Sequence, residues 1–232
     1  MTALDTATDA SAASINRGHR VLFRILTTLF RGLSRLFLRL SIEGRENLPR
    51  RGGYVVAPGA HRSIIDTAVI AVTPQDTMFR FMGAESYFET PGLGLFLRAL
   101  GGFPVVRSST DREAMRLAED VLRSGEPLVI FPESTRFSGP EVQPLKDGAA
   151  FIAARAGVPL VPIGIGGGER AWPKGQKLPR PKRMSIIVGE PIYPTQRAPG
   201  ERVKRTEVRR LTADLQASLQ VLFDRAQGRI GL

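Results

Sequence analysis

The chain has 232 residues, and 33 Lys and Arg against 22 Asp and Glu give it a net charge of +11. Its length suffices for one domain with a sizeable core, and its charge favours anionic partners: nucleic acid, phosphorylated metabolites or an acidic membrane surface. With no cysteine and only two histidines, the chain has no thiolate zinc site, histidine cluster or cysteine nucleophile. We therefore expect no metal and no cofactor, and chemistry that uses histidine, carboxylates and cations.

Two segments precede the expected globular domain, which we place at residues 43–232. Residues 1–14 are small and polar, which predicts a disordered tail. Residues 15–42 carry apolar side chains at three- and four-residue steps and no acidic residue, which predicts an amphipathic helix. At about 100° per residue, one side of this helix collects arginines, namely Arg17, Arg20, Arg24, Arg31, Arg35 and Arg39.

The single sign of charge on this helix favours contact with a membrane surface. A solvated helix commonly mixes Glu with Lys, whereas arginines beside leucines suit anionic headgroups, with the apolar face in the acyl boundary. No apolar run is long enough to span a bilayer, and no signal peptide is recognisable. We expect a peripheral protein on the cytoplasmic face of the cell membrane. The alternative is an ordinary surface helix packed on the domain.

Short apolar runs alternate with helical patterns from Gly53 onward. Helices are predicted over residues 110–125, 146–157 and 205–227 from the three- and four-residue spacing of apolar side chains. The alternation predicts an α/β fold, a single domain with a central, mostly parallel sheet flanked by helices. The runs typical of buried strands are YVVAP, MFRFMG, FPVVR, PLVIFPE, PLVPIGI and MSIIVG.

His61 and Asp66 lie five residues apart in the segment AHRSIID. Within one regular helix they would be rotated by about 140° and would not meet. Pro58 and Gly59 favour a turn, and Ser63 fits the N-cap of a following helix. Asp66 would then lie in the first helical turn and hold one imidazole nitrogen of His61, while the other nitrogen takes a proton from a hydroxyl. The alternative is a structural pair at a helix start.

A serine nucleophile is missing from this arrangement, because the chain contains no Gly-x-Ser-x-Gly elbow. The simplest completion is that the nucleophile belongs to the substrate. His61 would then activate a substrate alcohol, and the transfer would take one step without a covalent enzyme intermediate.

Two arginines follow predicted strands, Arg107 at the end of GGFPVVR and Arg136 at the end of FPESTR. Ligands of open α/β sheets bind at the carboxyl ends of strands, so two guanidinium groups there can clamp a phosphate. The alternative is a pair of surface arginines. Glu133, in FPESTR, can orient an arginine or hold its loop by accepting backbone donors.

The segment from His61 to Asp66, GGFPVVR, FPESTR and VPLVPIGI occur in the order and approximate spacing of the four sequence blocks of the glycerolipid acyltransferase family. From about Gly44 to Gly189 the chain resembles this family, above all its 1-acylglycerol-3-phosphate (lysophosphatidic acid) acyltransferases. The resemblance implies that His61 deprotonates a glycerol hydroxyl, which attacks the thioester of acyl-CoA or acyl carrier protein while Asp66 orients the ring.

The same resemblance implies a lysophospholipid acceptor and phosphatidic acid as the product, in phospholipid biosynthesis. VPLVPIGI would shape the acyl-donor side. Ala60 stands where many family members carry Asn, and Ser134 where Gly is usual. The implied phosphate-binding residues are Arg107, Glu133, Ser134, Thr135 and Arg136, with Ser63 and Lys146 as secondary candidates.

Other interpretations remain open at this point. Glycerol-3-phosphate or a glycolipid would also present a hydroxyl near an anionic group, and an inactive relative would keep the pocket as scaffolding. The basic stretch 173–183 fits a loop near headgroups or an acidic carrier, or a solubilising loop. A basic membrane- or nucleic-acid-binding protein would explain the charge, but we find no nucleic-acid recognition module and expect no such partner. GIGGGER lacks the last glycine of a dinucleotide fingerprint.

Overall fold

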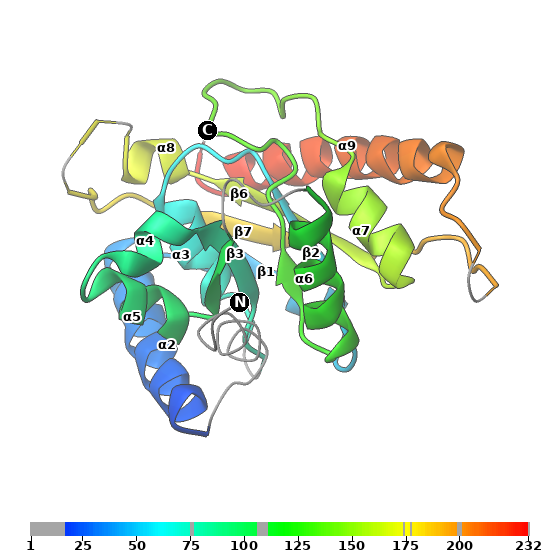
Figure 1. Cartoon of the computed structure of the whole chain (residues 1–232). Helices are drawn as coiled ribbons and strands as arrows, with labels where there is room; N and C mark the ends of the chain where they lie inside the picture. Colours follow the sequence, from blue (N-terminus) through cyan, green and yellow to red (C-terminus); the bar gives the residue numbers. More distant parts are fainter. Residues whose placement is uncertain are drawn as a thin grey trace.

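The computed structural model of the chain describes residues 17–74, 77–105, 111–173, 175–176, 178–198 and 201–231. The described residues form a seven-stranded sheet in the order β1-β7-β6-β2-β5-β3-β4 (Figure 1). Its pairs are parallel except for β6 and β7, which run antiparallel. This confirms the predicted mostly parallel sheet. The strands are β1 Ser41–Glu43, β2 Val55–Gly59, β3 Arg80–Ala84, β4 Gly102–Val105, β5 Leu128–Val129, β6 Leu160–Gly166 and β7 Ser185–Val188.

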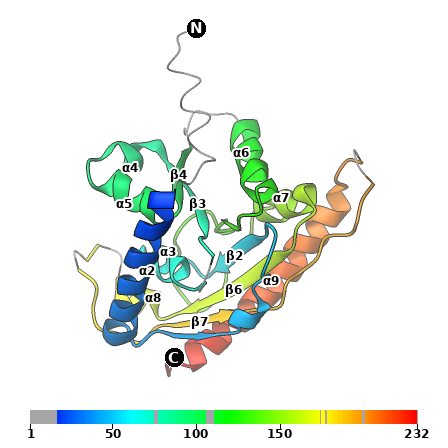
Figure 2. The same ribbon diagram turned by 90° about the horizontal axis from the view of Figure 1, so that it is seen from below.

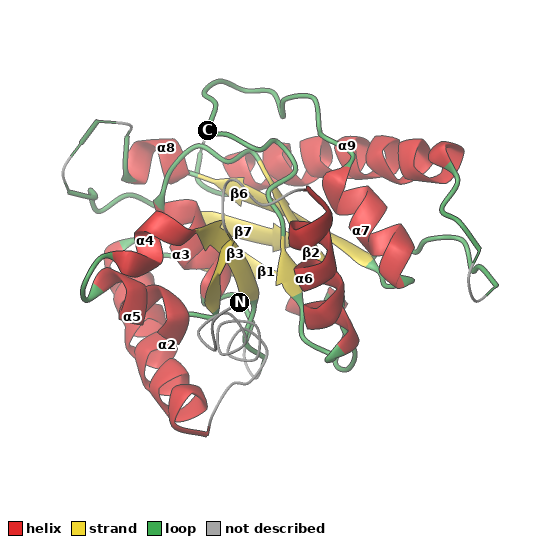
Figure 3. Cartoon of the chain, in the orientation of Figure 1, coloured by secondary structure: helices red, strands yellow, loops and turns green. Residues whose placement is uncertain are grey.

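Helices cover both faces of this sheet (Figures 1 to 3). Successive side chains of a strand point to opposite faces, and so the neighbours Val55 and Val56 of β2 belong to different apolar clusters. On the Val56 face lie α2 Arg17–Phe37, α3 Ile65–Ala71 and α8 Gly168–Ala171. On the Val55 face lie α6 Asp111–Arg123, α7 Gly148–Ala156 and α9 Arg205–Gly228. The short helices η1 Arg45–Asn47, α4 Glu85–Glu89 and α5 Leu93–Ala99 complete the fold.

The long C-terminal helix α9 lies along β6 and β7 (Figure 2). Its predicted apolar side chains are buried, among them Leu211, Leu215 and Leu219. The backbones approach closely because β6 has glycine beneath the helix. A methyl group added at Gly164 would lie 2.4 Å from the backbone oxygen of Leu222, closer than packed atoms allow.

The N-terminal helix is shorter than the sequence predicts. It ends at Phe37, and Arg39 takes a left-handed backbone conformation with φ 43°. The main chain then pairs with Met184, which donates to the carbonyl of Leu38 at 3.0 Å. Residues 41–43 consequently form β1 at the edge of the sheet, although the sequence pattern predicts that residues 41 and 42 belong to the helix.

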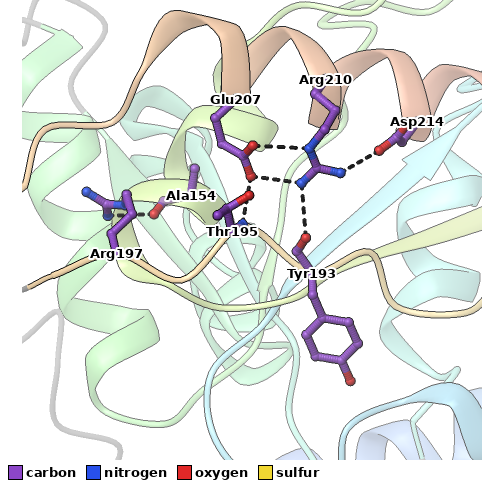
Figure 4. A network of polar contacts seen from close by, with 7 residues as sticks. All are labelled: Ala154, Tyr193, Thr195, Arg197, Glu207, Arg210 and Asp214. Carbon is purple, nitrogen blue, oxygen red and sulfur yellow. Dashed lines mark hydrogen bonds and ion pairs between the residues drawn. The ribbon is translucent and has the colours of Figure 1, made fainter.

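Polar contacts fix the segment between β7 and α9 (Figure 4). The carboxylate of Glu207 accepts a hydrogen bond from the backbone N–H of Thr195 at 2.7 Å and another from the guanidinium group of Arg210 at 2.8 Å. Arg197 donates to the carbonyl of Ala154 at 2.7 Å. A cavity of about 910 Å³ lies beside this segment, and no predicted site residue lines it.

Candidate active site

The candidate site lies where β2 ends and the chain turns into α3. Ala60 makes the turn with φ 56° and is fully buried. His61 follows, and Asp66 lies in the first turn of α3, as predicted. The site thus forms at the carboxyl end of a central strand, where open α/β sheets bind their ligands.

The structure brings His61 and Asp66 into contact. Nδ1 of His61 lies 3.2 Å from Oδ2 of Asp66, and the carboxylate is fully buried. The same Oδ2 accepts hydrogen bonds from the backbone N–H groups of Arg62 at 2.8 Å and Ser63 at 2.7 Å. When Nδ1 carries the proton, it donates to this oxygen and Nε2 keeps a free lone pair. Within the described ranges Nε2 has no hydrogen-bond partner.

The loop after β5 packs against the histidine from the other side. The rings of Phe131 and His61 stack, with centroids 4.2 Å apart and planes at 30°. The backbone N–H of Phe137 donates to the carbonyl of His61 at 3.1 Å. These contacts restrict both the ring and the main chain of His61.

Glu133 connects this loop to the histidine through its backbone. One carboxylate oxygen accepts from the N–H of His61 at 2.8 Å, and the other accepts from the N–H of Gln143, also at 2.8 Å. The side chain is buried, with 3 % of its surface exposed. Of the roles considered from the sequence, the geometry corresponds to holding the loop by accepting backbone donors. The phosphate-binding role of Glu133 stays a prediction.

Ser63 does not cap α3 as the sequence predicted. The N-cap is Ile64, which makes no side-chain capping hydrogen bond. The hydroxyl of Ser63 instead donates to the carbonyl of Trp172 at 2.7 Å, and its contact with the N–H of Ile65 is long, at 3.4 Å. The prediction was wrong because a carbonyl 109 residues away in sequence competes for the hydroxyl.

The remaining predicted phosphate-binding residues lie on the outer side of the same loop. Ser134, Thr135 and Arg136 are exposed, and Ser134 has φ 64°. Lys146 is also exposed, and its backbone N–H donates to the carbonyl of Pro132 at 2.9 Å, which closes the loop. Arg107 lies outside the described residues.

Two residues of α9 that were not predicted as site residues anchor this loop. Gln220 accepts from the N–H of Val142 at 2.8 Å, and Gln216 accepts from the N–H of Leu145 at 3.1 Å. The signal was present in the sequence, because both glutamines recur at helical spacing on α9 beside its apolar face. Without the fold, nothing indicated which loop they would meet.

The predicted membrane-contacting helix packs on the domain by one face and exposes an apolar stripe on another. Phe30 and Phe37 pack against the core, whereas Ile25, Leu29, Leu33 and Leu36 have 52 to 82 % of their surface exposed. Arg35 and Arg39 are exposed, and Arg31 donates to the carbonyls of Val72 and Pro74. The side chains of Arg17, Arg20 and Arg24 lie outside the described part of the structure.

None of the helices that the structure describes is long and apolar enough to cross a membrane. The described residues also include no group of three or more histidine or acidic side chains placed to hold a metal ion.

Comparison with known proteins places this arrangement in a class. The profile of the acyltransferase family matches residues 39–166, which include His61, Asp66 and the loop of Glu133. The chain belongs to this family, and the protein is an acyltransferase.

Individual relatives agree with this class. The chain is 31% identical over 154 residues to the 1-acyl-sn-glycerol-3-phosphate acyltransferase of Bacillus subtilis, covering 66% of this chain and 74% of that relative. It is 30% identical over 165 residues to a 1-acyl-sn-glycerol-3-phosphate acyltransferase of Chlamydomonas reinhardtii, covering 70% of this chain but only 49% of that relative.

A solved structure shares the fold. The 1-acyl-sn-glycerophosphate (LPA) acyltransferase PlsC of Thermotoga maritima superimposes with a TM-score of 0.66 at 23% identity, over 93% of this chain and 87% of that one. The likeness extends beyond the residues matched by the family profile to nearly the whole chain.

Proposed function

We propose that this protein transfers a fatty acyl group from an acyl thioester to the hydroxyl of 1-acylglycerol-3-phosphate, giving phosphatidic acid in phospholipid biosynthesis. The observation that carries the proposal is the contact between Nδ1 of His61 and Oδ2 of Asp66. The names of the relatives in Bacillus and Chlamydomonas support the acceptor. The donor is acyl-CoA or acyl carrier protein, both of which present the same thioester.

The proposed reaction uses His61 as a general base. Nε2 takes the proton of the acceptor hydroxyl as its oxygen attacks the thioester carbonyl carbon. The carbon–sulfur bond then breaks, and the leaving thiolate takes the proton from the imidazolium ring. Asp66 stabilises the positive ring through Nδ1 and keeps the productive tautomer. The chain itself forms no covalent intermediate.

The acceptor phosphate is proposed to bind at the exposed side of the loop after β5. Arg136 supplies a guanidinium group there, and Ser134 and Thr135 supply hydroxyl donors. Arg107 is the second proposed arginine. Glu133 is proposed to hold this loop against His61, so that the phosphate-binding residues keep a fixed position relative to the base.

We also propose that α2 binds the anionic surface of the membrane in which the acceptor lies, at the cytoplasmic face. The stripe of Ile25, Leu29, Leu33 and Leu36 offers exposed apolar surface, and arginine flanks it. Burial lowers the pKa of Arg45, and the nearby charges of Arg31 and Arg35 lower it further. An anionic headgroup would relieve this concentration of like charge.

The experiment that tests the activity is transfer of labelled palmitate from palmitoyl-CoA, and in parallel from palmitoyl carrier protein, to lysophosphatidic acid in vesicles. We expect His61→Ala to lower kcat by about 10²- to 10⁴-fold, the usual contribution of a general base. The matched control is His19→Ala, which removes the other histidine and should retain activity.

Two outcomes would contradict the proposal. Normal turnover by folded His61→Ala would exclude His61 as the base. Product from glycerol-3-phosphate or a glycolipid, but not from lysophosphatidic acid with either donor, would reassign the acceptor within the same family.

A further inference from the structure

The two oxygens of the Asp66 carboxylate have different surroundings. Oδ2 receives the contacts from His61, Arg62 and Ser63 described above. Oδ1 is buried and, among the described residues, has no hydrogen-bond partner. A buried carboxylate oxygen normally has a donor, so the position of this oxygen needs another explanation.

Gly168, the first residue of α8, lies directly against that oxygen. A methyl group added at Gly168 would lie 2.0 Å from Oδ1 and 3.0 Å from Cγ of Asp66. The φ of Gly168 lies outside the left-handed region that favours glycine, so the backbone conformation does not require glycine at this position. Glycine is required because of the carboxylate: only a residue without Cβ lets the main chain of α8 come this close to Oδ1 of Asp66.

The helix that carries Gly168 is held in place at both ends. The N–H of the preceding residue, Gly167, donates to the side chain of Gln227 at 3.1 Å. Ala171 is fully buried in the core, and the carbonyl of Trp172 receives the hydroxyl of Ser63 at 2.7 Å. Because Ser63 also donates its N–H to Asp66, α8 contacts the His61–Asp66 turn at two points.

We infer that Gly168 is a positioning residue for the reaction: its missing side chain lets α8 close over Oδ1 of Asp66 and leaves Oδ2 as the oxygen that faces Nδ1 of His61. The inference rests on the proposed role of His61. Any side chain at residue 168 must displace the carboxylate, and Oδ2 then loses its alignment with the ring and with the two backbone donors. Gly168 acts through Asp66 and does not touch the substrate.

The first test compares Gly168→Ala with Gly228→Ala. Both residues are helical glycines, but nothing lies within 4 Å of a methyl group at Gly228. Replacing a helical glycine by alanine is by itself stabilising, so any loss at Gly168 reports the contact with Asp66. We expect Gly168→Ala to lower kcat by about 10²-fold or more, with the KM for the acceptor within about threefold, and Gly228→Ala to behave as the wild type. A kcat for Gly168→Ala equal to that of Gly228→Ala would overturn the inference.

The second test does not depend on turnover. With ¹⁵N-labelled histidine in a His19→Gln background, the NMR signals of one imidazole ring remain, that of His61. We expect the Nδ1–H tautomer in the parent protein and a loss of that preference in Gly168→Ala. An unchanged ring spectrum would overturn the inference. Because this readout needs no acyl transfer, failure of the proposed activity and failure of the positioning role are distinguishable.

A double-mutant cycle measured by Tm covers the case in which Gly168→Ala folds poorly. Once Asp66 is replaced by alanine, the carboxylate with which the methyl group clashes is gone. Gly168→Ala should therefore lower the Tm of the parent protein but not that of Asp66→Ala. Equal losses of Tm in both backgrounds would show that Gly168 serves the fold independently of Asp66, and would overturn the inference.

Discussion

At the scale of single residues, two positions at which the chain departs from its family pattern share one backbone feature. Ala60 and Ser134 have φ of 56° and 64°, in the left-handed region. Asn and Gly, the residues common at these positions in the family, are the two that adopt this region most easily. Both strained residues border the site, one before His61 and one after Glu133, where tertiary contacts hold the backbone in place.

The strain at Ser134 can be tested by removing it. Relief of the left-handed conformation is worth about 1–2 kcal/mol, and the added freedom of glycine in the unfolded chain costs about 0.4–1 kcal/mol. We therefore expect Ser134→Gly to raise the free energy of unfolding by up to about 1.6 kcal/mol in urea denaturation. Ser138→Gly, in the same loop but without a positive φ, is the control and should lower it. A loss of stability in Ser134→Gly equal to that of the control would show that residue 134 is unstrained.

At the scale of elements, the predicted helices and strands that are long or strongly patterned are found in the structure. The helix over 146–157 ends at Gly157, which has the left-handed conformation of a C-terminal cap with φ 68°. The apolar stripe of α9 faces the sheet as predicted. By contrast, β1, α4 and α5 were not predicted: β1 overlaps the predicted N-terminal helix, and the five and seven residues of α4 and α5 are too few for a helical period to show.

The contacts of Glu207 with the loop between β7 and α9 make part of the free energy of unfolding depend on pH. The hydrogen bond from Arg210, together with the backbone N–H of Thr195, lowers the pKa of Glu207 from 4.5 to about 2 (Figure 4). A carboxylate whose pKa is lowered by folding stabilises the native state above its unfolded pKa. This contribution is therefore fully present above about pH 4.5 and is lost as the pH falls towards 2.

Glu207→Gln should remove that dependence. We expect a loss of about 1 kcal/mol in the free energy of unfolding at pH 7, and a flatter stability curve between pH 4.5 and 2, measured by urea titration. Glu190→Gln, at an exposed glutamate, serves as the control. Coinciding curves for the wild type and Glu207→Gln would show that the contact contributes no net stability.

At the scale of the whole molecule, α2 has two apolar faces, one packed on the domain and one exposed, where an amphipathic helix has a single apolar face. Its buried face holds it to the domain, and the residues that follow it, Leu38 and Leu40, belong to the core. Deleting the first 40 residues would therefore damage the fold as well as the proposed membrane contact. Substitutions within the exposed stripe test the membrane contact without removing the residues that pack in the core.

The double variant Leu29→Ser and Leu33→Ser is the sharper test of membrane binding. Burying a leucine side chain is worth about 1.5–3 kcal/mol, so we expect each substitution to weaken binding to phosphatidylglycerol vesicles about tenfold or more in a sedimentation assay. Val221→Ser replaces an apolar residue of α9 that is 59 % exposed and should bind normally. Undiminished binding of the double variant would place the membrane contact elsewhere.

The sequence by itself determined the features that depend on local pattern. Alternating apolar runs and helical periods gave the class of fold, and the turn residues before His61 gave a route by which His61 and Asp66 can meet. Four motifs in order indicated the acyltransferase family. These features are readable because their physical cause lies within a few residues, in backbone preference and in the repeat of apolar side chains.

Only the tertiary structure decided which partner each polar group has. The hydroxyl of Ser63 bonds to Trp172, the carboxylate of Glu133 to the backbone of His61 and Gln143, and Oδ1 of Asp66 lies against Gly168. Except for the bond from Gln143, which lies ten residues from Glu133, these contacts join segments that are remote in sequence, and a short polar side chain carries no pattern that identifies a remote donor or acceptor. The same holds for α2, where packing against the core chose the buried face and left the leucine stripe exposed.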